Sequence, residues 1–291
     1  MTRMRNVRRF AVLLAALAMV AAACGDDGPT ASDGGSCEVG ELNLVTANQL
    51  TVATGETVFP PWMGVGDDVF DVPESGTGFE GALVYALAEE MGFTADQVVF
   101  ARTGFDEAIT AGTKDWDFNI QQYSITDTRD EVVDFSDPYY TTRQSLVAFP
   151  DSGFASPGSL DDLKGATLGV AIGTTSLDFV EDVIKPDTDA SVYDDNAAAV
   201  AAMQAGQIDG IVVDLPTAYF VTAVQVEGAV IAAQFADDAA APDNYGMLFA
   251  EGNSLVGCVN GALDTLSDGD VLSDLEDEWL TQGGDIPTVG G

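Results

Sequence analysis

Three segments in the first part of this sequence indicate its fold: LTVAT (50–54), GFEGALVYALAEEMG (78–92) and QVVFA (97–101). The first and third are short apolar runs rich in β-branched residues, as in buried strands. The middle segment places apolar side chains on one face of a helix, namely Phe79, Leu83, Ala86, Leu87 and Met91. A strand, a helix and a second strand in this order predict a βαβ unit with two parallel strands in one sheet.

The same alternation continues along the chain. FDEAITAG (105–112) predicts a short helix, and DFNIQ (117–121) predicts a third strand. A second set begins after QSLVAF (144–149). It comprises a helical turn capped by Ser159, a strand over 166–172, a helix over 175–184, the strand ASVY (190–193), a helix over 196–206, a strand over 207–213 and a helix over 216–226. A strand over 245–250 and helices over 252–267 and 269–281 close the chain, so we expect two α/β lobes.

The first 24 residues have the composition of a secretory signal. Four arginines precede the apolar run from Phe10 to Ala23, which is shorter than the roughly 20 residues that span a bilayer. Cys24 follows three alanines and resembles the lipidated cysteine of lipoprotein signals; an ordinary signal peptide cleaved nearby is the alternative. We expect a signal peptide over 1–23 and a lipid anchor with a flexible tether over 24–40. This predicts an exported protein, held at the extracellular or periplasmic face of the cell membrane by its lipid alone.

The composition narrows the possible chemistry. The 291 residues include 48 acidic and 10 basic ones, no histidine, and a net charge of −38. The missing histidine excludes Ser-His-Asp and Cys-His nucleophiles and the commonest transition-metal ligand, and no calcium-loop spacing is present. The negative charge disfavours binding to nucleic acid, because it repels the phosphate backbone. We therefore expect no catalytic activity, no metal or cofactor, and a small-molecule partner.

Two cysteines remain once Cys24 is assigned to the anchor. In an oxidising compartment, Cys37 and Cys258 predict one disulfide; two buried thiols are the alternative. The disulfide would place the helix over 252–267 beside the start of the folded region. The chain would then cross between the lobes at about 146–150 and 240–246.

The two crossings divide the chain into lobes. We expect lobe 1 to comprise 41–146 with 243–284, lobe 2 to comprise 147–242, and 285–291 to form a tail. Two crossings make a hinge, and a ligand would lie in the cleft outside the carboxyl ends of the strands.

A set of segments resembles the family 3 extracellular solute-binding proteins, the polar amino acid receptors of ABC importers. The segments are LTVATGETVFPPW (50–62), GFEGALVYALAEEMG (78–92), SITDTRDEVVDFSDPYY (124–140), GVAIGTTSLDFV (169–180) and VVDLPTA (212–218). The third is the most specific. The resemblance implies a two-lobed α/β fold of the type II periplasmic-binding-protein class, each lobe a mostly parallel sheet flanked by helices, with two crossover hinge strands. It also implies a monomer that binds an amino acid and delivers it to an ABC transporter permease.

A free amino acid carries two charges, and burying either one unpaired is costly. Arg129, one of three arginines left after the signal, can offer a planar fork to the carboxylate. Ser124 and Thr126 can supply hydroxyl and backbone donors. The alternative is a surface arginine paired with a neighbouring aspartate, Asp127 or Asp130.

The resemblance assigns partners from the second lobe. Thr174 and Thr175, which follow Gly173 at a strand-to-helix junction, would give the second carboxylate contact, although Thr174 can also cap the helix. Asp214 ends a strand and would take the ammonium group; a cap for the helix at Pro216 is its alternative.

The resemblance also assigns the cover of the ligand and the pocket for its side chain. An aromatic cover is expected at Phe59, with Trp62 behind it, although either ring can instead fill the lobe edge. By position in the family pattern the side-chain pocket involves Glu56, Thr103, Gly104, Gln122 and Tyr123. Gln121 and Gln122 stand where the family often has small hydroxyl residues. Their amides could hold a polar ligand side chain, and Glu56 could hold a cationic one; the sequence does not choose between them.

Two other functions remain open. The family fold also carries cyclohexadienyl dehydratase activity, in which Glu56 or Asp214 would do general acid-base work. A ligand-sensing domain without transport coupling is the other alternative.

Overall fold

The computed structural model describes residues 36–280 and 286–290. The predicted signal peptide, Cys24 and most of the predicted tether lie outside these residues. Within the described ranges, no helix combines the length and the apolar character needed to cross a bilayer.

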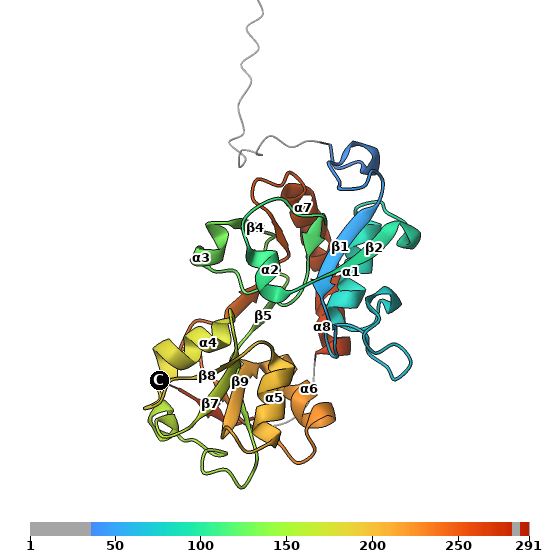
Figure 1. Cartoon of the computed structure of the whole chain (residues 1–291). Helices are drawn as coiled ribbons and strands as arrows, with labels where there is room; N and C mark the ends of the chain where they lie inside the picture. Colours follow the sequence, from blue (N-terminus) through green and yellow to red (C-terminus); the bar gives the residue numbers. More distant parts are fainter. Residues whose placement is uncertain (1–35, 281–285, 291) are drawn as a thin grey trace, which may run out of the picture. The chain divides into compact units, whose positions relative to one another are not determined.

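The first lobe contains the predicted βαβ unit (Figure 1). Its described strands form a sheet in the order β2-β1-β3-β12-β4. They are β1 (Leu50–Gly55), β2 (Val98–Thr103), β3 (Phe118–Asn119), β4 (Val133–Phe135) and β12 (Leu248–Ala250). The helices of this lobe are α1 (Phe79–Glu90), α2 (Phe105–Ile109), α3 (Asp127–Asp130), α7 (Val256–Asp268) and α8 (Val271–Trp279). Strand β1 is parallel to β2 and to β3, as the alternating pattern predicts.

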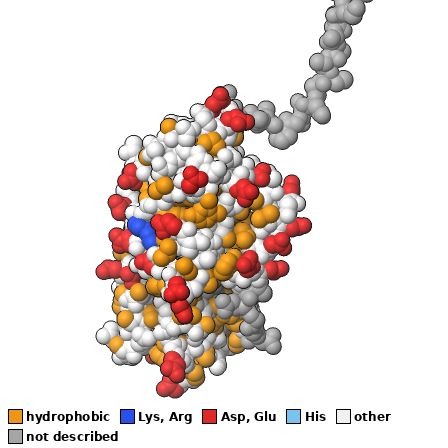
Figure 2. Space-filling view, turned by 90° about the vertical axis from the view of Figure 1, so that its right-hand side faces the viewer, with side chains coloured by type: hydrophobic (Ala, Val, Ile, Leu, Met, Phe, Trp, Pro, Cys, Tyr) orange, Lys and Arg blue, Asp and Glu red, His pale blue; other side chains and the backbone are white. Residues whose placement is uncertain are grey.

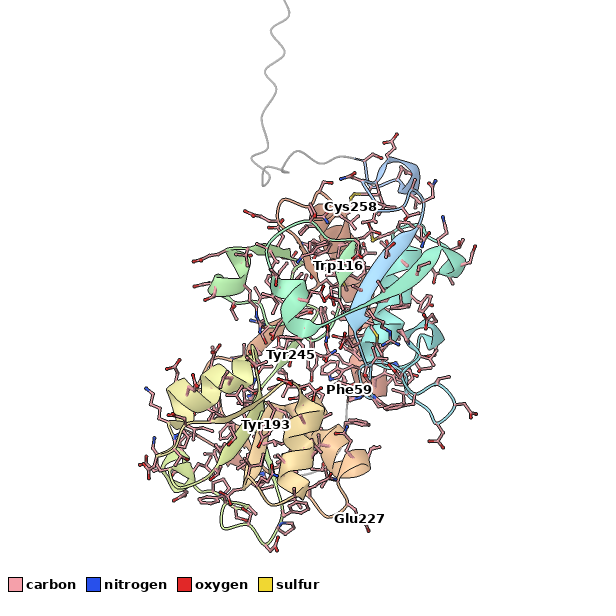
Figure 3. The ribbon with its side chains drawn as sticks, viewed as in Figure 1. Phe59, Trp116, Tyr193, Glu227, Tyr245 and Cys258 are labelled. Atoms are coloured by element: carbon pink, nitrogen blue, oxygen red, sulfur yellow. A yellow bond between two sulfur atoms is a disulfide. The ribbon has the colours of Figure 1, made fainter. Side chains whose placement is uncertain are left out.

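The core of the first lobe lies between this sheet and helices α1 and α7. Helix α1 buries Phe79, Leu83 and Leu87, which are fully inaccessible to solvent. Helix α7 contributes Val259 and Leu263 to the same cluster. Burial of these large side chains is the main source of stability of such a layer. A disulfide joins Cys37 to Cys258 on α7, which confirms the predicted pairing (Figure 3).

The second lobe is built around a sheet whose described strands are ordered β13-β10-β6-β9-β7-β8. They are β6 (Gln144–Ala148), β7 (Leu168–Ala171), β8 (Ser191–Tyr193), β9 (Gly210–Asp214), β10 (Val230–Phe235) and β13 (Thr288–Val289). The helices are α4 (Thr175–Phe179), α5 (Asn196–Gln204) and α6 (Leu215–Phe220); α4 and α6 each continue as a π-helical turn, over 180–184 and 221–225. Alternate residues of β9 enter two different apolar clusters, so both faces of this sheet are covered.

Two short strands connect the lobes. Strands β5 (Tyr140–Thr142) and β11 (Asp243–Tyr245) pair antiparallel, with Asp243 opposite Thr142. The chain continues from β5 into β6 of the second lobe and from β11 into β12 of the first (Figure 1). The two-lobed fold with two crossover strands is thereby confirmed. Each sheet is mostly parallel, as expected, because its described strands share one direction except β12 in the first lobe and β6 in the second, which run antiparallel to their neighbours.

Strands β10 and β13 do not follow from the sequence pattern. In the segment expected as a tail, Thr288–Val289 pairs in parallel with Gln234 and Phe235 of β10. Val289 is buried in the core of the second lobe. Helix α8 packs on α1 and α7, so the chain returns to the second lobe between α8 and β13. A two-residue strand is too short to show any periodicity in sequence.

Acidic side chains are spread over the visible surface of the described residues, with far fewer basic ones among them (Figure 2). They do not gather into one patch on this face. This distribution favours a general role in solvation over a single acidic docking surface.

Candidate ligand-binding site

A cavity of about 530 Å³ lies between the lobes. Glu56 follows β1, Gly104 follows β2, Ile172 follows β7, and Asp214 ends β9. The cavity therefore sits at the carboxyl ends of strands from both sheets, where ligands of open α/β folds bind. The expected residues that line it are Glu56, Phe59, Gly104, Gln121, Gln122, Ser124, Arg129, Thr174, Thr175 and Asp214.

Arg129 brings a buried charge to the cavity from helix α3. Arg129 is only 8% exposed to solvent. The guanidinium donates from Nη1 to the carbonyl oxygen of Ser124 (2.7 Å) and from Nη2 to that of Gly173 (2.8 Å). It also lies over the ring of Phe105, with 5.4 Å between Cζ and the ring centroid. Burial lowers the pKa of Arg129 below its ordinary value, since the charged form loses hydration.

Arg129 is not a surface arginine paired with Asp127 or Asp130, which was the alternative. Within the part of the chain that the structure describes, the ion pairs join Arg102 to Asp71 and Arg143 to Asp237, and none involves Arg129. Two of the five guanidinium N–H groups are used on the two carbonyl oxygens, so three remain for another acceptor. A buried cation without an anionic partner is costly, and an anionic group in the cavity would offset that cost.

The two threonines combine capping with a place in the cavity wall. Thr174 accepts a hydrogen bond from the backbone N–H of Leu177 (3.3 Å). It therefore caps α4, which was the alternative to a ligand contact. The hydroxyl of Thr175 lies 3.2 Å from that of Ser124 in the other lobe and accepts from Nε2 of Gln144 (3.3 Å). Capping and a cavity position are therefore compatible at this junction.

Asp214 likewise serves two purposes. Its Oδ1 accepts from the backbone N–H of Thr217 (2.9 Å) at the start of α6, and its side chain lines the cavity. Burial raises the pKa of Asp214 to about 6, and the nearby charge of Asp243 adds to this effect. In the described residues no cation forms an ion pair with Asp214. The site thus presents an unpaired guanidinium from one lobe and an unpaired carboxylate from the other.

Four expected residues do not line the cavity, namely Trp62, Thr103, Tyr123 and Thr126. Trp62 is buried and donates from Nε1 to the hydroxyl of Thr217 (3.3 Å). Tyr123 is buried, with its ring stacked on Phe105 at 4.6 Å between centroids. Its neighbours Gln122 and Ser124 line the cavity, whereas Tyr123 does not. Thr126 caps α3 by accepting from the backbone N–H of Arg129 (3.3 Å) and does not line the cavity.

Phe59 does line the cavity, at its edge. Its ring stacks on that of Phe220 in the second lobe, with 5.7 Å between the centroids. Figure 3 shows Phe59 and Tyr245 near the space between the lobes. The stacked pair closes one side of the cavity with apolar surface.

Glu80 is a functional candidate that sequence reasoning missed. Its carboxylate is completely buried beside the cavity and accepts hydrogen bonds from the backbone N–H of Gln122 (2.9 Å), from Nε2 of Gln122 and from the hydroxyl of Tyr139. Burial raises the pKa of Glu80 to about 7, against the lowering effect of these hydrogen bonds. Glutamate is common in the first turn of a helix, so its position in α1 gave no signal of this role.

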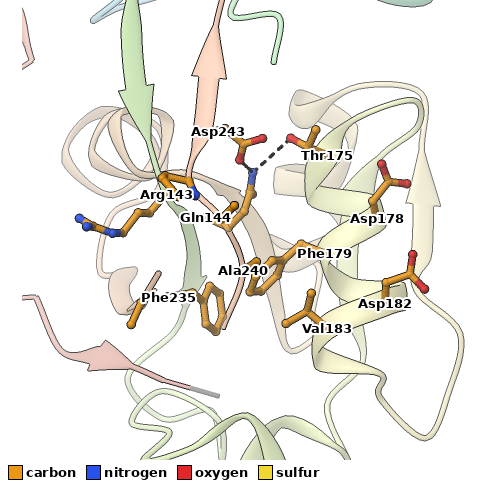
Figure 4. Close-up of a pocket in the computed structure, with 13 residues that line it drawn as sticks. Arg143, Gln144, Thr175, Asp178, Phe179, Asp182, Val183, Phe235, Ala240 and Asp243 are labelled. Atoms are coloured by element: carbon orange, nitrogen blue, oxygen red, sulfur yellow. Dashed lines mark hydrogen bonds between the residues drawn. The ribbon is translucent and has the colours of Figure 1, made fainter. Parts of the chain in front are cut away.

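A smaller cavity of about 220 Å³ shares Gln144 and Thr175 with the ligand cavity (Figure 4). Nε2 of Gln144 donates to Oδ2 of Asp243 in β11 (2.7 Å) as well as to Thr175, and its Oε1 accepts from the hydroxyl of Ser176 (2.7 Å). Gln144 therefore links the hinge strands to the start of α4. Of the residues expected in the ligand site, Thr175 alone also lines this second cavity.

The described fold and site define a class of protein. Two α/β lobes, joined by a pair of antiparallel strands and enclosing a polar cavity, are the features of the type II periplasmic-binding-protein-like class. Within that class, the profile of the bacterial extracellular solute-binding proteins, family 3, matches residues 50–282, and the chain belongs to this family.

Individual relatives agree with this assignment. The chain is 28% identical over 244 residues to the L-cystine-binding protein TcyJ of Escherichia coli (strain K12), covering 83% of this chain and 86% of that protein. It is 28% identical over 209 residues to the arginine-binding extracellular protein ArtP of Bacillus subtilis (strain 168), covering 70% and 78%. The solved structure of the ancestral amino acid-binding protein AncCDT-1, described as a precursor of cyclohexadienyl dehydratase, has a TM-score of 0.66 and 26% identity, covering 80% of this chain and 96% of that one.

Proposed function

We propose that this protein is the extracytoplasmic substrate-binding component of an ABC importer, which binds one amino acid in the interlobe cavity and delivers it to a permease. The observation that carries the proposal is the placement of Arg129 and Asp214, each without an ion-pair partner among the described residues, on opposite lobes of one cavity. A zwitterion of matching length satisfies both charges at once. The names of the matched relatives as amino acid-binding proteins support the same ligand class.

The ligand's carboxylate would take the remaining N–H groups of Arg129, and the hydroxyls of Ser124 and Thr175, which lie 3.2 Å apart, would be further donors. Its ammonium group would meet Asp214. Because these groups belong to different lobes, both ends of the ligand are satisfied only when the lobes approach each other. Binding then shifts the population toward the closed form, which is the form a permease can distinguish.

Contacts across the cleft support this closure. Arg129 donates to the Gly173 carbonyl (2.8 Å), and Trp62 donates to the Thr217 hydroxyl (3.3 Å). The chain is therefore able to bring the lobes into hydrogen-bonding contact around the hinge. We assign the closing bodies as the first lobe, with the sheet β2-β1-β3-β12-β4, and the second lobe, with the sheet β13-β10-β6-β9-β7-β8.

We assign the ligand a cationic side chain. Once Arg129 and Asp214 are matched with the ends of the amino acid, the carboxylates that line the remaining cavity are Glu56, Asp106, Glu107, Asp194 and Asp195. Among the described lining residues, Arg129 is the sole basic one. An anionic side chain would be repelled in such a space, whereas an ammonium or guanidinium group is attracted. The arginine named as the ligand of ArtP belongs to the same chemical class.

We further propose that the chain acts without catalysis and as a monomer at the membrane, anchored through a lipid on Cys24. Turnover of prephenate or arogenate by the purified protein would contradict the proposal that the chain acts without catalysis. The anchor is tested by replacing Cys24 with alanine in cells: the variant is expected in the soluble exported fraction, whereas continued recovery with membranes would contradict lipidation of this cysteine.

The ligand is tested by a thermal-shift screen with the twenty standard amino acids, followed by titration calorimetry of those that act. A ligand that binds only the native fold raises its melting temperature by mass action. We expect arginine or lysine to give the largest rise and aspartate and glutamate none. A largest rise with a neutral amino acid would contradict the cationic side chain but leave the receptor proposal standing; no rise with any amino acid would contradict the receptor proposal.

A further inference from the structure

The surroundings of Glu80 fix the orientation of one residue of the cavity wall. Glu80 lies on α1 and is fully buried, while Gln122 lines the cavity. Both the backbone N–H and the side-chain Nε2 of Gln122 donate to the Glu80 carboxylate, one to each oxygen. The backbone of Gln122 has φ of +53°, a left-handed conformation that is uncommon for residues other than glycine. Glu80 thus holds both the backbone and the side chain of Gln122.

This contact determines which end of the Gln122 amide is available to a ligand. An ionised carboxylate only accepts hydrogen bonds, so the NH₂ group of Gln122 has to face Glu80. The amide oxygen then lies on the opposite edge. Within residues 36–280 and 286–290, no group donates a hydrogen bond to this oxygen. Buried polar atoms without a partner do occur in this structure, but the Gln122 oxygen is not one of them, so it is accessible. The oxygen is therefore the hydrogen-bonding group that Gln122 leaves for an occupant of the cavity.

We propose that Glu80 is a positioning residue for ligand binding: its carboxylate holds the Gln122 amide so that the amide oxygen accepts a hydrogen bond from a cationic N–H group of the bound amino acid. This inference rests on the proposed function. A glutamine amide can turn either its NH₂ group or its oxygen toward a ligand. The contact with Glu80 makes Gln122 a hydrogen-bond acceptor for the ligand.

The Glu80→Gln variant tests the orientation. The residue at position 80 must still accept from the backbone N–H of Gln122, so its oxygen stays there and its new NH₂ group faces the Gln122 side chain. The Gln122 amide is then expected to turn over and to present NH₂ to the cavity, where it repels a cationic donor. The probe is the amino acid that binds the wild-type chain most tightly among the twenty standard ones. Its affinity, measured by calorimetry well above pH 7, is expected to fall about tenfold or more.

A double-mutant cycle separates positioning from a structural role. In a Gln122→Ala background the amide is gone, and Glu80→Gln is expected to change the affinity by less than about twofold. Glu89→Gln, which neutralises an exposed carboxylate on the same helix, is the matched control and is expected to leave the affinity unchanged. An equal loss in both backgrounds, or no loss from Glu80→Gln in the wild-type chain, would overturn the proposal.

The pH dependence of wild-type binding provides a test that needs no change at Glu80. The groups that face Glu80 are Tyr139, which donates to it, and Tyr123 and Asp214, which interact with it through charge. Burial raises the pKa of both tyrosines, so they stay neutral near pH 7. Protonated Glu80 can donate to the Gln122 oxygen and withdraw it from the cavity. The affinity of the wild-type chain is thus expected to fall as the pH drops through about 7.

The Gln122→Ala variant is expected to lack this fall and to keep only the one at lower pH that Asp214 causes, near its pKa of about 6. Identical pH profiles for the two chains would contradict the role of Glu80. Failure of the wild-type chain to bind any of the twenty amino acids would contradict the proposed function itself, and this inference with it. The two failures are therefore distinguishable by the wild-type titration.

Discussion

At the scale of single residues, the protein places three ionisable side chains, two buried and one half-buried, near the cavity without a counter-ion among the described residues. Arg129, Asp214 and Glu80 all lie at or beside the cavity, and in the described ranges none of them belongs to an ion pair. Arg102 and Arg143, by contrast, are paired with aspartates and partly exposed. Unpaired burial lowers the stability of a fold, so such groups are typical of sites where a ligand completes the pairing.

The ligand affinity should depend strongly on Arg129. Removing its guanidinium in Arg129→Ala leaves the carboxylate of a bound amino acid desolvated and without a partner. We expect a loss of at least about 2 kcal/mol, or roughly thirtyfold in affinity, by calorimetric titration. Arg143→Ala, which removes only the exposed pair with Asp237, is the control and should change affinity little. Equal losses for the two variants would refute the role of Arg129.

Glu80 should also make the stability of the fold depend on pH. Burial raises its pKa from an ordinary value of 4.5 to about 7, so the folded chain holds this proton more tightly than the unfolded chain does. The resulting contribution to the free energy of unfolding is fully present below pH 4.5 and is lost as the pH rises through about 7. Its size is on the order of 3 kcal/mol.

Calorimetric melting of Glu80→Gln across this range should therefore show a smaller decrease in stability with rising pH than the wild-type chain. Asp214 contributes in the same direction in both proteins, so the difference between them isolates Glu80. Glu89→Gln, with its exposed carboxylate, should follow the wild-type curve. Parallel curves for Glu80→Gln and the wild-type chain would show that Glu80 does not titrate in this way.

At the scale of elements, the disulfide attaches the N-terminal segment of the described chain to α7. The two cysteines are 221 positions apart in sequence. A cross-link that closes so long a loop restricts the unfolded chain, and the loss of a native disulfide typically costs about 2–5 kcal/mol.

We expect Cys258→Ser to lower the free energy of unfolding by an amount in that range, measured by denaturant titration. The double variant Cys37→Ser with Cys258→Ser should show the same loss, since a single bond is removed in each case. Ligand affinity should be unchanged, because neither cysteine lines the cavity. A stability equal to that of the wild-type chain under non-reducing conditions would mean that the disulfide does not form in solution.

At the scale of the whole described fold, the hinge and the contacts across the cleft form one mechanical unit. β5 and β11 are short, and their Tyr140 and Tyr245 pack in the core of the first lobe, whereas neither strand contributes to the apolar clusters of the second lobe. Rotation of the second lobe about these strands therefore leaves its own packing in place. Gln144 connects this pair of strands to Thr175 in the cavity wall. Movement at the hinge and movement of the carboxylate-binding residues are therefore coupled.

Closure should be visible in the fluorescence of Trp62. Its indole N–H bonds to Thr217 of the other lobe (3.3 Å), so its environment changes when the lobes separate. We expect a saturable change in emission when a binding amino acid is added, which Trp62→Phe removes. Trp116→Phe deletes a tryptophan buried within the first lobe and should retain the change. Persistence of the full signal in Trp62→Phe would contradict closure at this contact.

Several features of the site could be predicted from the sequence because they depend on residues close together in the chain. Arg129 lies five residues from Ser124, and its guanidinium reaches the carbonyl of that residue (2.7 Å). The capping positions of Thr174 and Asp214 follow from the strand-to-helix junctions that the hydrophobic pattern marks. Local pattern did not reveal that Tyr123 and Trp62 lie behind the wall, because that depends on which element packs against them.

The sequence by itself determined the alternation of strands and helices, the two lobes and the residue types that suit an amino acid, since periodicity and local hydrogen bonding act between near neighbours in the chain. The tertiary structure alone decided the antiparallel strands in each sheet, the pairing of Thr288–Val289 with β10, and the burial of Glu80 against Gln122. Each of these brings together segments far apart in sequence. Their energies come from burial and from hydrogen bonds across space, which no local pattern records.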